Sequence, residues 1–356
     1  ESRGLGDVYK RQIVGGMDSD FQVTLAEASA LFWGLHSEEE LEQEIAIAKK
    51  AAYLLRTCAG TKRFGSAALL RYVNNVNTKI DKQFSAINFY LEDDTVLIAF
   101  RGTDTSLTGV KESAMLSYMF PVPAQIEALY YFQETASLAN RPVRVCGHSK
   151  GGNLAVFAAV SCSNSLKKKI LGVYEDDAPG FPKQMLERHD YLEIKDRIYS
   201  FVPEGSVIGC LLEHNSSTKI VRSENEGLGQ HQASSWVIQD DHFEYADSRN
   251  AMSLFIEKYI KQLMEDVGSE NTEAVFETLF DFFEDSGITD YDSLKQLNIT
   301  NFLRAITSVK GITDQERRLI EQTAKLAISD LSRMFYKEKI ESRLKKLERN
   351  QEPDHA

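Results

Sequence analysis

The sequence of 356 residues lacks the features that mark a disulfide scaffold, a membrane-spanning protein or a nucleic-acid-binding protein. Its 4 cysteines show no CxxC or Cys/His ligand spacing, which argues against a disulfide framework and structural zinc and favours a reducing, cytoplasmic location. No apolar run approaches the ~18 residues of a membrane-spanning helix, so we expect no transmembrane segment. The net charge of −12 would repel a phosphate backbone, and nucleic acid is not expected as a partner.

The N-terminus also lacks a signal-peptide pattern, with no basic region followed by an apolar core. Residues Glu1–Gln12 resemble translated sequencing-adaptor sequence, and we expect them to be a non-native leader. Because the chain starts at Glu1 rather than at Met, the missing pattern does not exclude secretion.

The remaining sequence divides into two parts by its periodicity. Residues 13–250 alternate strand-like and helical runs, which predicts an α/β domain with a mostly parallel sheet flanked by helices. Residues 251–356 show helical spacing alone and predict an all-helical C-terminal region. The first part is expected to begin with helices over 13–77. After them we expect strands at 85–91, 95–100, 143–146, 171–174, 198–202 and 219–221, and helices at 122–139 and 153–160.

A nucleophile-elbow pattern carries the chemistry. Gly147-x-Ser149-x-Gly151 lies between a predicted strand and a predicted helix, which is the context that a GxSxG motif requires. The small flanking residues let strand and helix approach closely, and the serine then lies at a helix N-terminus that favours developing negative charge. The alternative is a glycine-rich turn with a surface serine.

A second motif supports the elbow. The run Val96–Thr103 is a strand that ends in Phe-Arg-Gly-Thr. With GHSKGG it resembles the class 3 (fungal-type) lipases, and GHSKGGNLA resembles more closely an uncharacterised bacterial family of predicted lipase-like hydrolases. This resemblance covers roughly residues 84–236 and implies an α/β-hydrolase fold. It also implies that the backbone amides of Thr103 and Lys150 form an oxyanion hole for the nucleophile Ser149.

The general base of this fold follows the last strand, well after the nucleophile. Four histidines lie downstream of the elbow: His189, His214, His231 and His242. His231 precedes Trp236 by several residues, as the catalytic histidine does in the lipases that this segment resembles. We expect His231 to be the base, with His214 as the alternative; a surface-loop histidine is the other interpretation of His231.

The acid departs from the class 3 pattern. Those lipases carry an aspartate where Ser206 stands in this chain, after the next-to-last strand. Two substitutes are within reach, Glu204 in the same turn and Asp177 after the preceding strand. We favour Asp177, because a carboxylate at a strand end is better fixed, although it could serve only to shape the turn before Pro179. A rearranged triad, a dyad and a non-catalytic protein all stay open.

These motifs predict a serine ester hydrolase of the lipase or esterase type, without metal or organic cofactor, acting on a small-molecule ester or lipid through an acyl-enzyme on Ser149. An acyltransferase would use the same residues. The alternative is a catalytically degenerate α/β-hydrolase that binds a lipid or a protein.

Two amphipathic segments add further hypotheses. The Met-rich residues 104–124 suit either a mobile lid over an acyl chain or ordinary core packing. The basic end of the final helix, 337–349, is compatible with transient contact with an anionic membrane surface or with a partner helix, or with packing on its own domain.

Overall fold

The computed structural model describes residues 13–43, 46–104, 106–267, 271–273, 313–315, 317–318, 321–322 and 326. The chain divides into two compact units, residues 1–253 and 254–356. The expected leader and most of the expected C-terminal helices, including the basic segment 337–349, lie outside the described residues.

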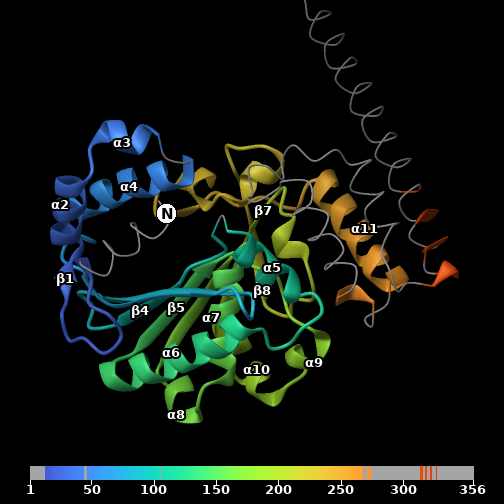
Figure 1. The fold of residues 1–356 in the computed structure, drawn as a ribbon, viewed down its shortest axis with the longest axis horizontal. Helices are drawn as coiled ribbons and strands as arrows, with labels where there is room; N and C mark the ends of the chain where they lie inside the picture. The colour runs from blue at the N-terminus through green and yellow to red at the C-terminus, as the bar shows by residue number, and fades with distance from the viewer. Residues whose placement is uncertain are drawn as a thin grey trace, which may run out of the picture. The chain divides into compact units, whose positions relative to one another are not determined.

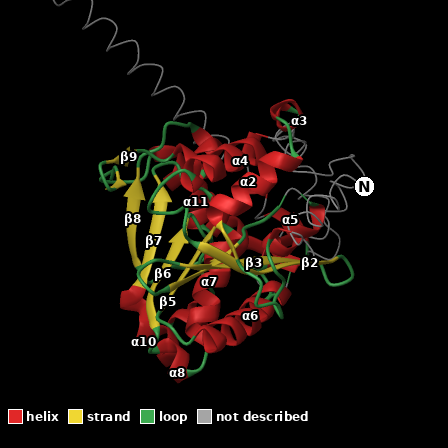
Figure 2. Cartoon of the chain, turned by 90° about the vertical axis from the view of Figure 1, so that its left-hand side faces the viewer, coloured by secondary structure: helices red, strands yellow, loops and turns green. Residues whose placement is uncertain are grey.

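An eight-stranded sheet organises the first unit (Figure 1). The strands follow one another across the sheet in sequence order; β1 to β4 pair antiparallel and β4 to β8 pair parallel. Figure 2 shows β6, β7 and β8 side by side with their arrowheads at the same end. The strands are β1 (Val23–Thr24), β2 (Ala68–Asn77), β3 (Lys82–Tyr90), β4 (Val96–Phe100), β5 (Val143–His148), β6 (Ile170–Asp176), β7 (Ile198–Pro203) and β8 (Ser217–Val221).

Helices flank this sheet, with α6 and α7 packed against its middle strands (Figure 1). Residues 150–160 of α7 are all buried, which explains why its sequence is apolar around nearly its whole circumference. The helices of the first unit are α2 (Leu25–Leu35), α3 (Glu38–Glu42), α4 (Ala46–Ala59), α5 (Leu107–Met115), α6 (Pro123–Ala139), α7 (Lys150–Ser161), α8 (Asn164–Lys167), α9 (Lys183–Leu186) and α10 (His189–Ile194). The last described helix, α11 (Ala251–Val267), belongs mostly to the second unit. A mostly parallel sheet flanked by helices confirms the predicted fold class.

The register of the parallel strands brings their carboxyl ends to one edge. His148 at the end of β5 pairs with Asp176 at the end of β6, and Asp176 pairs in turn with Phe201 near the end of β7. The residues that follow these ends, Ser149 and Asp177, therefore leave the sheet at the same edge. Ligand sites of α/β sheets lie at this edge.

The prediction of helices alone over residues 13–77 was wrong, because β1 and β2 occupy part of this region. The register of β2 against β3 shifts between Leu70 and Val73, and Arg71 in the bulge has φ 57°. The extra residue makes Leu69, Leu70 and Arg71 consecutively buried. A bulged strand therefore loses the alternation of apolar and polar residues by which strands are recognised in a sequence.

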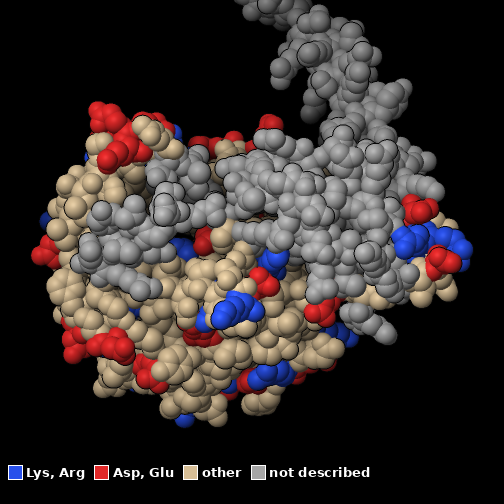
Figure 3. Space-filling view, viewed as in Figure 1, with Lys and Arg blue, Asp and Glu red and all other residues tan. Residues whose placement is uncertain are grey.

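Two short strands, β9 (Ile238–Gln239) and β10 (His242–Phe243), form a separate hairpin. Acidic side chains gather over α3, whose sequence is EEELE, at the upper left of Figure 3. Within the described ranges, no helix has the length and apolarity needed to cross a membrane.

Candidate active site

Ser149 occupies a strained turn between β5 and α7. Its backbone angles are φ 57° and ψ −131°, a combination that non-glycine residues rarely adopt. The backbone N–H of Ser149 donates to the carbonyl of Asp176 at 2.8 Å, and the Ser149 carbonyl accepts from Gly152 N–H at 3.0 Å. Neighbouring structure therefore holds the strained residue in place, as a nucleophile elbow requires.

The two glycines of the motif are required by close backbone contacts. A Cβ atom at Gly151 would lie 2.2 Å from the carbonyl oxygen of Phe100, and one at Gly147 would lie 2.2 Å from the carbonyl carbon and oxygen of Gly151. Any side chain at either position would separate α7 from β4 or β5. The GxSxG pattern thus reflects the approach of the helix to the strand on each side of the serine.

Asp177 and His231 meet although 54 residues separate them in the sequence. His231 Nδ1 lies 2.6 Å from Oδ2 of Asp177, and the Asp177 side chain is fully buried. Oδ1 of Asp177 accepts hydrogen bonds from the Gly209 N–H at 3.0 Å and from the Ser206 hydroxyl. A buried carboxylate with these partners fixes the orientation of the imidazole that it contacts.

His231 also lies against the elbow itself. The His148 and His231 rings are 4.5 Å apart between centroids, and His148 Nε2 donates to the His231 carbonyl at 2.6 Å. Burial and the neighbouring His231 lower the pKa of His148 to about 4, so His148 is neutral at pH 7. Among the described residues, the Ser149 hydroxyl makes no hydrogen bond to the His231 ring. Such catalytic hydrogen bonds are often long in free enzymes and tighten when substrate binds.

The two expected oxyanion-hole residues flank the serine. A Cβ atom on Gly102 would lie 3.3 Å from Cβ of Ser149, so the turn that leads to Thr103 lies against Ser149. Lys150 is the first residue of α7, where free backbone N–H groups and the helix dipole favour an anion. The Lys150 side chain is itself buried, with Nζ bonded to Gln83 and Glu112.

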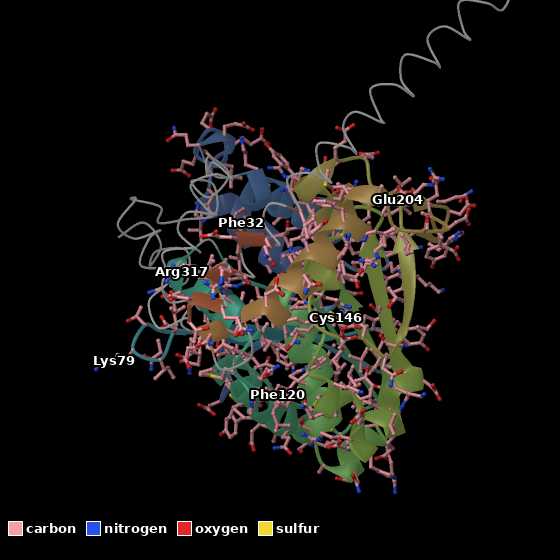
Figure 4. The ribbon with its side chains drawn as sticks, turned by 90° about the vertical axis from the view of Figure 1, so that its right-hand side faces the viewer. Phe32, Lys79, Phe120, Cys146, Glu204 and Arg317 are labelled. Atoms are coloured by element: carbon pink, nitrogen blue, oxygen red, sulfur yellow. The ribbon has the colours of Figure 1, made fainter. Side chains whose placement is uncertain are left out.

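Glu204 and His214, the alternative acid and base, have other partners. Glu204, labelled in Figure 4, follows the end of β7, where its backbone N–H donates to the Val221 carbonyl. His214 has Glu175 as its charged neighbour at 3.9 Å and lines a cavity of about 590 Å³ beside β7 and β8. The structure therefore brings Asp177 to His231 and places His148, the neighbour of Ser149, against the His231 ring; among the described residues, neither Glu204 nor His214 contacts this pair.

Three further site residues were missed by the sequence interpretation. In the sequence, Ser206 stands only where an aspartate is expected, His148 belongs to the elbow motif, and Glu112 is a polar residue of an amphipathic segment. The position of Ser206 in the family pattern was a signal that it belongs to the site. No local pattern identifies the partners of His148 and Glu112, since their contacts lie 83 and 38 residues away along the chain.

A mostly parallel sheet flanked by helices, with a strained serine between a strand and a helix, defines an α/β-hydrolase fold. The model of the Mbeg1-like family, a lipase-like family, matches residues 58–281, which is more than half of the chain. The chain therefore belongs to the Mbeg1-like family.

Comparison with solved structures finds fungal lipase complexes, among them the following two. The native Rhizomucor miehei lipase propeptide complex is 14% identical with a TM-score of 0.35, and the match covers 52% of this chain and 62% of that one, less than two thirds of its length. A fungal lipase–inhibitor complex has the same identity and TM-score, with 52% and 75% covered. No curated protein matches the chain.

Proposed function

We propose that this protein is a serine ester hydrolase of the lipase or carboxylesterase type. The observation that carries the proposal is the hydrogen bond between His231 Nδ1 and the buried Asp177 carboxylate, beside the strained turn at Ser149. Because Nδ1 donates to the carboxylate, the neutral ring has its lone pair on Nε2. That nitrogen is then the group able to take the proton of the serine hydroxyl.

The reaction would proceed in two half-reactions. Ser149 Oγ attacks the ester carbonyl while His231 accepts its proton, and the backbone N–H groups of Thr103 and Lys150 stabilise the oxyanion. The imidazolium then protonates the leaving alcohol, and Asp177 stabilises the positive charge meanwhile. Water, deprotonated by His231, hydrolyses the acyl-enzyme and frees Ser149. These steps require no metal ion or organic cofactor.

The finer assignments belong to the same proposal. The resemblance to class 3 lipases, and to the bacterial family with a GHSKGGNLA elbow, supports an acyl ester or lipid substrate and a role in lipid metabolism. The cysteine pattern supports a cytoplasmic location, and the basic C-terminal segment supports transient contact with a membrane surface.

The missing aspartate at Ser206 was the best support for a non-catalytic binding module. In the structure, Ser206 donates a hydrogen bond to the Asp177 carboxylate, whose other oxygen contacts His231; this supports Asp177 as the acid. A degenerate site would not need a buried acid, an oriented imidazole and a strained serine at one place.

The test is labelling with a fluorophosphonate probe together with turnover of a p-nitrophenyl ester. Wild type should label and turn over, whereas Ser149→Ala and His231→Ala should do neither. Ser161→Ala is the matched control, because it removes a serine from the far end of the same helix and should label like wild type. A folded wild type that stays unlabelled, with detergent present to open a lid, would overturn the proposal and favour the binding module.

A further inference from the structure

We infer that the buried ion pair between Lys150 and Glu112 positions the oxyanion hole, and that α5 is a fixed wall of the site. The inference rests on the proposed hydrolase function and adds two positioning residues, Glu112 and Ser113, which touch the two oxyanion residues without touching the reacting atoms.

Lys150 makes a complete set of bonds inside the protein. Its side chain has no exposed surface, and Nζ donates to Oε2 of Glu112 at 2.7 Å, to the Gln83 carbonyl at 2.7 Å and to Gln83 Oε1 at 2.8 Å. An ammonium group has three hydrogens, and each of them therefore has a partner. Burial lowers the pKa of Lys150, so the charged form depends on the carboxylate opposite.

Glu112 connects Lys150 to three elements of the fold. One carboxylate oxygen accepts from the Gln83 N–H of β3 at 2.8 Å and from Lys150, and the other accepts from the Ala124 N–H in the first turn of α6 at 2.8 Å. Glu112 has no exposed surface either. Because Glu112 is part of α5, this helix is fixed to β3, to α6 and to the residue after the nucleophile.

Ser113, the next residue of α5, contacts Thr103, the second residue of the proposed oxyanion hole. The Ser113 hydroxyl donates to the Gly109 carbonyl at 2.9 Å and lies 2.5 Å from Oγ1 of Thr103. Since Ser113 has given its single hydrogen to Gly109, Thr103 is the donor in the second contact. Two consecutive residues of one helix therefore hold the two residues whose backbone N–H groups would bind the oxyanion.

The Lys150–Glu112 ion pair fixes the positions of the oxyanion donors more than it stabilises the fold. A buried ion pair can often be replaced by apolar residues at little cost in stability, so the need for a stable core does not explain it. The five hydrogen bonds of the pair are directional, and an oxyanion hole works only when its donors lie about 2.7–3.1 Å from the developing charge. The burial of Met115 and Leu116 at the end of α5 favours core packing over a mobile lid for this segment.

The experiment compares kcat, KM and melting temperature for p-nitrophenyl ester hydrolysis in full-length variants. Lys150→Met and Glu112→Gln should each lower kcat about 30- to 300-fold and leave KM within threefold, because a displaced oxyanion donor acts on the transition state. The double variant Lys150→Met/Glu112→Gln should regain melting temperature, since no unpaired charge remains, but should keep the low kcat.

Lys167→Met is the matched control. Lys167 is also buried, at 2% exposure, and forms an ion pair with Glu193 at 3.7 Å in a different part of the first unit. This variant should melt earlier and keep kcat within twofold. Ser113→Ala provides a milder test that preserves the ion pair, with a kcat about 3- to 10-fold lower, as loss of one hydrogen bond implies.

The outcomes separate this inference from the proposed function. An active wild type whose Lys150→Met and Ser113→Ala variants keep wild-type kcat overturns the inference and leaves the hydrolase intact. The same holds if kcat recovers with melting temperature in the double variant, or if Lys167→Met loses as much kcat as Lys150→Met. A wild type that neither labels nor hydrolyses overturns both.

Discussion

Ser206 donates its hydroxyl hydrogen to Oδ1 of Asp177, from the turn after β7 to the end of β6. The other oxygen of the same carboxylate lies 2.6 Å from Nδ1 of His231. Ser206 stands where the resemblance to class 3 lipases places an aspartate. Here it donates a hydrogen bond to Asp177, a carboxylate at the end of the neighbouring strand. Because the two strand ends are adjacent, a carboxylate can reach the same imidazole from either one.

The first prediction separates the two candidate acids. Asp177→Asn should lower kcat about 10³- to 10⁴-fold, because an amide cannot stabilise the imidazolium and favours the wrong tautomer. Glu204→Gln, which makes the same chemical change one strand away, should keep kcat within twofold. Steady-state ester hydrolysis measures both, and a large loss in Glu204→Gln alone would assign the acid to Glu204.

The second prediction concerns the support of the acid. Ser206→Ala removes one donor from the buried Asp177 carboxylate and leaves the Gly209 N–H in place. A hydrogen bond to a charged group contributes about 1.5–3 kcal/mol, so we expect kcat to fall about 10- to 100-fold. Ser206→Thr keeps the hydroxyl and should restore most of the activity; equal activity in Ser206→Ala and wild type would show that the serine is dispensable.

The third prediction concerns two glycines with opposite effects. Gly151→Ala places a methyl group 2.2 Å from the Phe100 carbonyl oxygen and should destabilise the protein by about 2 kcal/mol or more. Gly34 lies on the exposed side of α2, and a Cβ atom added there would have no neighbouring atom within 4 Å. Gly34→Ala should therefore stabilise the protein by about 0.5–1 kcal/mol, because alanine has the higher helix propensity. Urea denaturation measures both changes, and a neutral Gly151→Ala would contradict the close approach of α7 to β4.

The fourth prediction is a pH dependence of stability. Burial, together with the nearby carboxylates of Glu175 and Asp177, raises the pKa of Asp176 to about 7. Between pH 4 and 7 the folded protein therefore holds a proton that the unfolded chain has released. The contribution of Asp176 to stability is complete below pH 4 and is lost as the pH rises towards 7.

Asp176→Asn should remove this dependence. The difference in unfolding free energy between the variant and wild type should grow in favour of the variant from pH 4 to pH 7 and level off above it. Denaturant titrations at pH 5, 6, 7 and 8 measure this difference. A difference that stays constant over the series would mean that Asp176 titrates at the same pH in the folded and unfolded protein.

The sequence was informative where the chemistry is local. The elbow needs a strand, small residues on both sides of the serine and a helix, and the residues Val143–Val160 show each of these. The choice of Asp177 over Glu204 depended on one physical argument, the rigidity of a strand end, and the structure brings Asp177 to His231. That contact could be expected only because the ends of parallel strands meet at one edge.

The remaining errors and omissions share a physical cause. The bulge at Arg71 breaks the two-residue alternation of β2, so periodicity does not identify this strand in the sequence. Glu112 has the spacing of a solvent-facing residue in α5, yet it is fully buried because Lys150 lies opposite. Whether a charged residue is exposed or paired depends on a partner distant in the sequence, and periodicity carries no information about that partner.

The sequential strand order has a consequence for synthesis. Each new strand of the sheet can pair with the strand made just before it, so the domain can assemble from its N-terminal side while translation continues. The ribosome makes His231 after Ser149, and at about 5–20 residues per second Ser149 precedes His231 by roughly 4–16 s. Under the proposed mechanism, the nascent chain carries its nucleophile without its general base during that interval and would not yet hydrolyse esters.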